Sequence, residues 1–214
     1  HFAAGTFGAI GTYFVYRAFL AFDTSEITAV PASCTLRLYG ISAGAYDQYT
    51  GSLAVVKAAA AGTSADSSED WDAGDFCAGI NGFASGSTMA GNVTDYCTQP
   101  GVVSSSWQVN AFNEITLNAT ARQDMGSSDY FKICVLGYGS DYLNSDAIDG
   151  NVNGGPLLGF NYFASHTFTT SSQRPHIRYT AYGNKVCGVT NSTISKIAGV
   201  SVNQIDKCVG VEGD

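Results

Sequence analysis

Short runs of β-branched and aromatic residues recur along this chain, and stretches rich in Gly, Ser, Asp and Asn separate them. The runs favour strands, and the intervening stretches favour turns and loops. Residues 34–39 alternate apolar and polar side chains, which is the pattern of a strand with one buried face. The same signals predict further strands at residues 12–22, 52–58, 114–117, 130–136, 158–168 and 177–182.

Helical signals are confined to residues 119–125. Strands that do not alternate with helices are typical of antiparallel sandwiches rather than of parallel α/β sheets. The sequence therefore predicts an all-β fold, an antiparallel jelly roll or β-sandwich, at residues 12–182. The run at 12–22 is apolar on both faces, so we expect it to be a central strand.

An N-terminal arm, residues 1–11, precedes the predicted sandwich. Beyond the first residue it carries no acidic or basic side chain, and an uncharged apolar arm needs a partner in water. We expect the arm, through Phe2, Phe7 and Ile10, to add as a strand to a neighbouring subunit. The alternative is that the arm forms an edge strand of its own domain.

A C-terminal extension, residues 183–214, follows the predicted sandwich. It contains no aromatic residue, and the segment at 194–200 recurs eleven residues later at 205–211. Two copies are too few for a solenoid, so the sequence predicts a short tail rather than a repeat domain.

The charge of the chain limits its partners. Lys and Arg number 10 against 18 Asp and Glu, a formal net charge of −8, which argues against a nucleic-acid partner. Charged residues make up only 13% of the chain, which lessens repulsion between packed copies. The longest apolar run, residues 53–61, contains Lys57 and is shorter than the ~20 residues that span a bilayer, so we expect no membrane span.

The six cysteines lack the paired spacing of zinc sites, so we expect them to form disulfides. Proximity in the sequence favours Cys77 with Cys97 and Cys187 with Cys208, although other pairings are open. These two pairings would leave Cys34 with Cys134 as a bridge between strands.

Glycosylation sequons begin at Asn92, Asn118 and Asn191. A single sequon in a chain rich in Ser, Thr and Asn can arise by chance. Together with an even number of cysteines, however, the three indicate an extracellular protein, either secreted, on a cell surface or on a virion.

The order of several segments is similar to that of a known family. YRAFLAFDTS (16–25) and ASCTLRLY (32–39) resemble the opening of the DNRLRE (disaggregatase-related) domain, an extracellular β-sandwich. NEITLNAT (113–120), YFAS (162–165) and PHIRYT (175–180) resemble its middle and closing strands. The cysteines and the acidic insert at 69–75 depart from the family pattern.

The resemblance covers residues 12–182 and implies an extracellular sandwich with no catalytic residues. Domains of this kind occur in secreted polysaccharide-associated proteins and in structural and fibre proteins of phages. The repeated tail is similar to C-terminal segments of phage structural and tail proteins.

Two motifs suggest chemistry. Residues 40–44 spell G-x-S-x-G, which would present Ser42 as a nucleophile, with His166 as a candidate base, but no helix is predicted after it. Residues 149–154 begin like a calcium loop, but Phe160 replaces the closing carboxylate, so an Asx-rich turn is the preferred interpretation. Whether residues 141–153 hold calcium stays open. We expect no catalysis, no metal and no cofactor.

The sequence therefore predicts the structural subunit of an extracellular or virion-associated filament, a helical homo-oligomer built by strand addition. The alternative is a carbohydrate-binding module, with Trp71 as an exposed platform and Trp107 as a second ring for sugar stacking. A serine hydrolase that uses Ser42 is the third hypothesis.

Overall fold

The protein is described by a computed structural model, and its fold is all-β, as predicted. The structure describes residues 2–9, 12–42, 44, 51–58, 89–143, 158–165 and 167–181, together with short strands at 185–186, 189–190, 196–197 and 200–201.

The strands of the body pair in antiparallel fashion throughout. In chain order they are β1 (Phe2–Ala9), β2 (Thr12–Tyr16), β3 (Ala18–Asp23), β4 (Ser33–Tyr39), β5 (Leu53–Lys57), β6 (Phe112–Thr116), β7 (Tyr130–Gly137), β8 (Leu158–Phe163) and β9 (His176–Thr180). They form sheets of order β2-β1-β8, β6-β4-β9 and β3-β7-β5.

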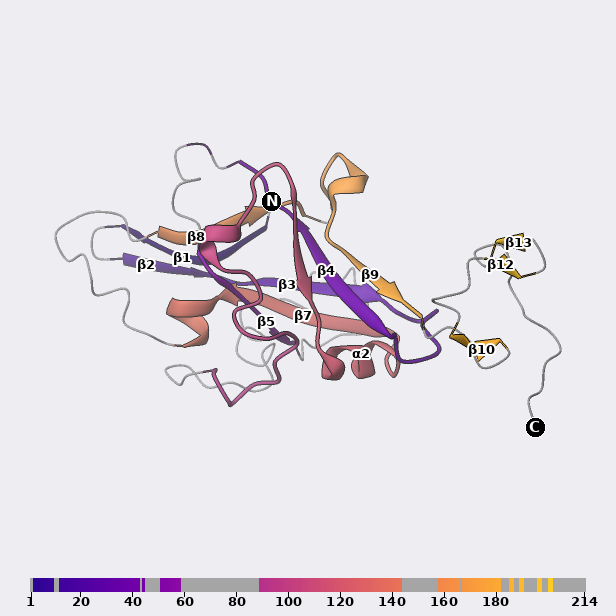
Figure 1. The fold of residues 1–214 in the computed structure, drawn as a ribbon. Coiled ribbons are helices and arrows are strands. Elements are labelled where there is room, and N and C mark those ends of the chain that lie inside the picture. Colours follow the sequence, from indigo (N-terminus) through magenta and orange to yellow (C-terminus); the bar gives the residue numbers. More distant parts are fainter. Residues whose placement is uncertain are drawn as a thin grey trace.

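The first two sheets are continuous, because β8 joins the chain just beyond the end of β4. Gly40 bridges Phe163, and the Ile41 N–H donates to the carbonyl of Tyr162 at 3.1 Å. In Figure 1, β4 of this layer crosses in front of β3 and β7, and apolar side chains fill the space between the layers. The molecule is thus an antiparallel sandwich, whereas its strand order does not by itself establish a jelly roll.

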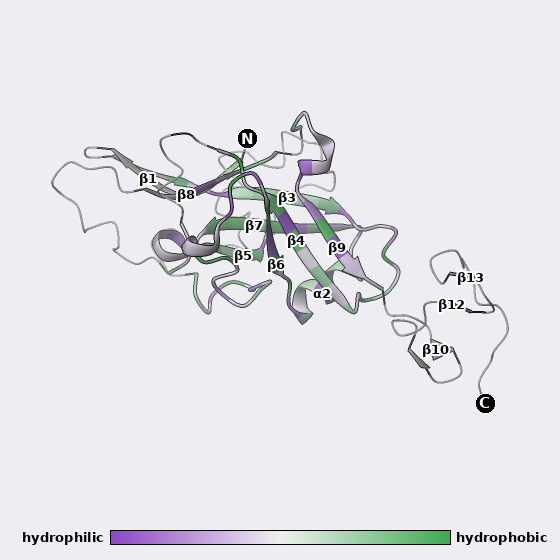
Figure 2. Cartoon of the chain, turned by 45° about the horizontal axis from the view of Figure 1, so that its top comes forward, coloured by the Kyte–Doolittle hydropathy of each residue, from purple (hydrophilic) through white to green (hydrophobic). Residues whose placement is uncertain are grey.

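The β3-β7-β5 sheet is buried on both faces. Leu53, Val55 and Ile133 face the core between the layers. Their sequence neighbours Val56 and Cys134 face a second cluster on the far side of this sheet, as expected for side chains that alternate along a strand. Figure 2 shows that β7 is hydrophobic over most of its length.

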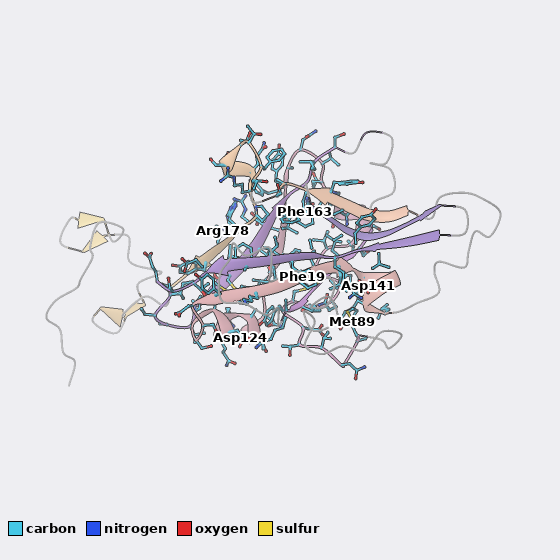
Figure 3. The ribbon with its side chains drawn as sticks, turned by 180° about the vertical axis from the view of Figure 1, so that it is seen from behind. Phe19, Met89, Asp124, Asp141, Phe163 and Arg178 are labelled. Carbon is cyan, nitrogen blue, oxygen red and sulfur yellow. The ribbon has the colours of Figure 1, made fainter. Side chains whose placement is uncertain are left out.

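The segments that cover the second cluster come from two loops. Met89 and Tyr142 close over the sheet, and Phe19 of β3 packs against the same cluster. Figure 3 places Phe19, Met89 and Asp141 in the same region of the molecule. Tyr142 ends the π-helix η3 (Tyr138–Tyr142) that follows β7 directly.

The predicted helix at 119–125 is confirmed with the same bounds as α2 (Ala119–Met125). Asn118 caps it, because its side chain accepts the N–H of Ala121 at 3.0 Å. Asp124 ties the helix to the sandwich by accepting hydrogen bonds from Lys57 at 2.8 Å and from the Tyr96 hydroxyl. Short 3-10 helices lie at η2 (Ser104–Ser106) and η5 (Ser171–Gln173).

The prediction of one central strand at 12–22 is wrong. The run divides at Arg17 into β2 and β3, which belong to different layers and lie at the edges of their sheets. Arg17 forms a bidentate ion pair with Asp141, with both N–O distances at 2.7 Å. The Arg17 guanidinium, which binds Asp141 of η3, therefore interrupts the apolar run at the point where the chain passes from one layer to the other.

The tail contains two short hairpins. Strand β10 (Lys185–Val186) pairs with β11 (Val189–Thr190), and β12 (Lys196–Ile197) pairs with β13 (Val200–Ser201). The second hairpin begins within the first copy of the sequence repeat and ends one residue beyond it, at Ser201, and the second copy lies outside the described residues.

A search of the described residues for a helix that is long and apolar enough to span a membrane finds none.

Candidate functional site

The N-terminal arm is a strand within its own domain. Strand β1 lies between β2 and β8, so both of its edges are paired within the chain. Phe2 packs on Phe163, with ring centroids 5.8 Å apart. The side chains of Phe7 and Ile10 lie outside the described residues. Deleting the arm would therefore remove an internal strand of the sheet rather than a free extension.

One edge of this sheet is β2, and we call residues 12–16 the β2 edge. Within the described residues β2 pairs only with β1. Its last two side chains, Val15 and Tyr16, are 43% and 41% exposed. No charged residue or proline occurs from Phe2 to Tyr16, although these are the usual means by which proteins protect an edge strand.

A second surface lies on the solvent side of the β6-β4-β9 sheet. We call it the outer face, and it consists of Arg37, Tyr39, Phe112, Glu114, His176 and Arg178. Its side chains lie side by side because of the strand register: Arg37 is opposite both Glu114 and His176, and Tyr39 is opposite Phe112. The apolar residues that alternate with them, such as Leu36 and Leu38, face the core.

The outer face holds two arginines around one carboxylate. Glu114 accepts from Arg37 Nε at 2.9 Å through one oxygen and from Arg178 at 3.2 Å through the other. His176 Nδ1 lies 2.9 Å from the carbonyl of Arg174, which can only accept, so Nδ1 carries the proton. The other ring nitrogen then accepts from Arg37 at 3.3 Å.

Aromatic rings border Arg37. The guanidinium carbon of Arg37 lies 4.1 Å from the centroid of the Phe112 ring. The rings of Tyr39 and His176 meet Phe112 edge-on, at 5.2 and 5.1 Å between centroids. The Tyr39 hydroxyl donates to the carbonyl of Asn110 at 2.9 Å. These contacts hold the Arg37 side chain in one orientation above the sheet.

Close packing explains the first glycine of the G-x-S-x-G motif. A Cβ at Gly40 would lie 2.1 Å from the carbonyl oxygen of Gln108. Ser42 is exposed, and its hydroxyl accepts the N–H of Gly44 at 3.2 Å. His166 and residues 45–50 lie outside the described residues, so the helix that a nucleophile elbow requires stays untested.

The expected bridge between Cys34 and Cys134 is absent. Cys34, Cys97 and Cys134 are free, buried thiols. Cys34 lies in the core between the layers, whereas Cys134 faces the cluster on the opposite side of the β3-β7-β5 sheet. Cys97 carries no bond to Cys77, which lies outside the described residues, as do Cys187 and Cys208.

Burial makes these thiols weak acids. It raises the pKa of Cys34 to about 11 and that of Cys97 to about 12, from 9.0, and it also raises the pKa of Cys134. A buried thiol in an apolar setting is unreactive, because the thiolate is the nucleophile.

We therefore expect iodoacetamide at pH 8 to leave Cys34, Cys97 and Cys134 unmodified in the native protein and to modify all of them in urea. Mass spectrometry of peptides from both samples measures the difference. Rapid native labelling of any of the three would contradict the burial seen here. Failure to label Cys34 or Cys134 in urea without reductant would show a disulfide instead.

The predicted glycosylation sites differ in their surroundings. Asn92 is exposed in a turn that follows Met89. Asn118 is half-buried, and its side-chain nitrogen donates to the carbonyl of Asp95 at 2.7 Å while its oxygen caps α2. Asn191 lies outside the described residues. The structure favours Asn92 over Asn118 as an acceptor, because a glycan on Asn118 would compete with both hydrogen bonds.

The remaining candidate residues, for sugar stacking and for calcium binding, either make contacts within the fold or lie outside the described residues. Trp107 is buried in the core and presents no ring for sugar stacking, and Trp71 lies outside the described residues. Asp141 is engaged by Arg17, and most of the candidate calcium loop, from residue 144 on, is not described. Within the described part of the chain, no group of three metal-ligating side chains is present.

Sequence reasoning did not identify the outer face as a site. The alternation along residues 34–39 placed Arg37 and Tyr39 on the solvent side, but their neighbours come from residues 112–114 and 176–178. Only the register of β4 with β6 and β9 brings these residues together.

No family model matches this chain. Neither a curated protein nor a solved structure is significantly similar to it. The resemblance to the DNRLRE domain therefore depends on the segments quoted above.

Proposed function

We propose that this protein is the structural subunit of an extracellular or virion-associated filament and that subunits join through the β2 edge. The observation that carries the proposal is an edge strand with no charge or proline and with exposed Val15 and Tyr16. An open edge of this kind offers backbone N–H and C=O groups to a strand of another subunit.

Growth into a filament sets a requirement on the partner surface. If β2 paired with β2 of another copy, the contact would be self-complementary and would close a dimer. A filament needs β2 to meet a different edge of the next subunit, so that each addition leaves a new β2 edge open.

Three further features support this proposal. Charged residues are only 13% of the chain, so packed copies repel one another weakly. The segments that resemble the DNRLRE domain imply an extracellular setting in which fibre proteins are common. Strand β1 pairs with β8 over six residues and fixes β2 to the sandwich, which gives the open edge a rigid support.

Electron microscopy of the native protein in plain buffer tests assembly directly. The expected result is regular filaments of one diameter. Isolated particles or closed dimers at all concentrations up to several milligrams per millilitre would overturn the proposal.

A charge on the open edge is expected to abolish the filaments. Val15→Lys places an ammonium in the proposed interface, where its desolvation opposes strand addition. Val103→Lys is the matched control, because Val103 is 45% exposed and lies outside the sheets. Electron microscopy and sedimentation should show monomers for the first variant and filaments for the second.

Circular dichroism of both variants checks that they fold. Filaments of unchanged length and yield from folded Val15→Lys would exclude the β2 edge as the interface.

A further inference from the structure

We propose that the outer face binds an acidic polysaccharide, with Arg37 and Arg178 holding its carboxylates and Phe112 and Tyr39 contacting its sugar rings. This inference does not depend on assembly, because the outer face and the β2 edge lie on different strands.

The charge of the outer face is the first argument. Elsewhere among the described ion pairs, each cation has its own carboxylate: Arg17 pairs with Asp141, and Lys57 pairs with Asp124. On the outer face two guanidinium groups share Glu114. One positive charge is left uncompensated among the described side chains, on a protein whose net charge is −8.

The orientation of the arginines is the second argument. Arg37 is held through Nε by Glu114 and through one terminal nitrogen by His176, so its other terminal nitrogen is not used by these contacts. Arg178 donates to Glu114 from one nitrogen, and its side chain is 62% exposed. Guanidinium groups donate charge-assisted hydrogen bonds to carboxylates, so the unused donors of the held Arg37 beside those of the exposed Arg178 suit a ligand with more than one carboxylate.

The aromatic rings give the class of ligand. Tyr39 and Phe112 lie opposite each other, directly beside Arg37 along β4 and Glu114 along β6. An aromatic ring packs against the apolar face of a sugar, and a neighbouring arginine binds a carboxylate on the same sugar. The outer face is about 10 Å wide across three strands and about 14 Å long over five residues, which favours a chain of sugars over a single small acid.

The position of the outer face agrees with a role in binding. Figure 3 shows Arg178 well separated from Asp141 and from the cluster around Met89. Ile177 of β9 packs against the core, whereas its neighbours His176 and Arg178 lie on the outer face. The outer face therefore stays available without any change in the core.

Isothermal titration calorimetry with oligogalacturonate at low ionic strength tests the inference. The matched probe is the methyl ester of the same oligomer, which keeps the sugars and removes the charges. We expect the acid to bind at least about tenfold more tightly than the ester, and we expect binding to weaken as salt rises. Equal affinity for the two probes, or no binding to either, would overturn the proposal.

Substitutions locate the binding site. Arg37→Gln and Arg178→Gln should each weaken oligogalacturonate binding by about fivefold or more. Lys132→Gln is the control, because it lowers the net charge equally on the other layer. Equal losses of affinity in all three variants would show that the net charge alone causes the effect, and this would overturn the proposed site.

Two further measurements separate the alternatives. Monomeric galacturonate should compete only weakly, and competition as strong as that of the oligomer would assign the site to a small carboxylate rather than to a polysaccharide. The monomeric Val15→Lys variant should bind like the parent protein. Loss of binding in that variant would mean that the ligand recognises an assembly, which contradicts a site within one subunit.

Discussion

Replacing Arg17 with methionine is expected to lower the free energy of unfolding by about 4 kcal/mol, measured by urea denaturation. The side chains of Arg17 and Asp141 are only 12% and 5% exposed, and they form two hydrogen bonds of 2.7 Å. Removing the guanidinium leaves a buried carboxylate without its partner. Removing one partner of a buried ion pair lowers the free energy of unfolding by far more than the intact pair contributes to it, because the remaining charge stays buried.

The control for this prediction is a pair in solvent. Arg178→Met removes a partner of Glu114, and the two side chains are 62% and 42% exposed, so a loss of no more than about 1 kcal/mol is expected. The double variant Arg17→Met with Asp141→Leu should recover most of the stability lost by Arg17→Met. If the double variant were as unstable as the sum of the single changes, the ion pair would not be the cause.

The Arg17 pair also has a consequence for the β2 edge. Arg17 directly follows β2, and Asp141 lies on η3, which follows β7. The pair therefore fixes the end of the edge strand to the other layer. We expect its loss to affect filament yield together with stability, whereas Val15→Lys should affect filament yield alone.

Gly51→Ala is expected to destabilise the fold by about 3 kcal/mol or more. A Cβ at Gly51 would lie 2.3 Å from the carbonyl oxygen of Gly159. The clash cannot be relieved locally, because the carbonyl of Gly51 accepts a hydrogen bond of 2.7 Å from the buried side chain of Asn161. Thermal and urea unfolding measure the loss.

Gly159→Ala is the matched control, since it adds the same methyl group from the other side of the same contact. A Cβ there would have Gly51 Cα at 3.9 Å as its nearest described neighbour, which is an ordinary van der Waals distance. We expect a change within about 1 kcal/mol. Equal effects from the two substitutions would contradict the asymmetry of this contact.

Local patterns predicted several elements of this protein well. The helix α2 lies at the predicted residues 119–125, because Asn118 provides a cap that depends only on the adjacent turn. Strand β4 shows the predicted alternation of buried and half-buried residues. Strand β7 lies within one residue of the predicted segment at 130–136. In each case the signal and its physical cause lie within a few residues of each other.

Other predictions failed where a distant residue decides the outcome. The division of residues 12–22 depends on Asp141, more than a hundred residues later in the chain. The pairing of Cys34 with Cys134 was what two pairings chosen by proximity in the sequence left over, but Cys134 faces the cluster on the opposite side of its sheet. A shift of one residue along a strand reverses the face of every side chain, and the sequence alone does not fix that register.

The sequence by itself determined that this chain forms an all-β protein with low charge and an uncharged N-terminal segment, because composition and period-two patterns are local properties. The tertiary structure decided where that segment goes: β1 is enclosed between β2 and β8, and among the described strands β2 pairs on one side only. It also decided which polar residues meet on the outer face. Both outcomes depend on cross-strand register and on contacts between residues far apart in the chain, which form only when the two layers pack together.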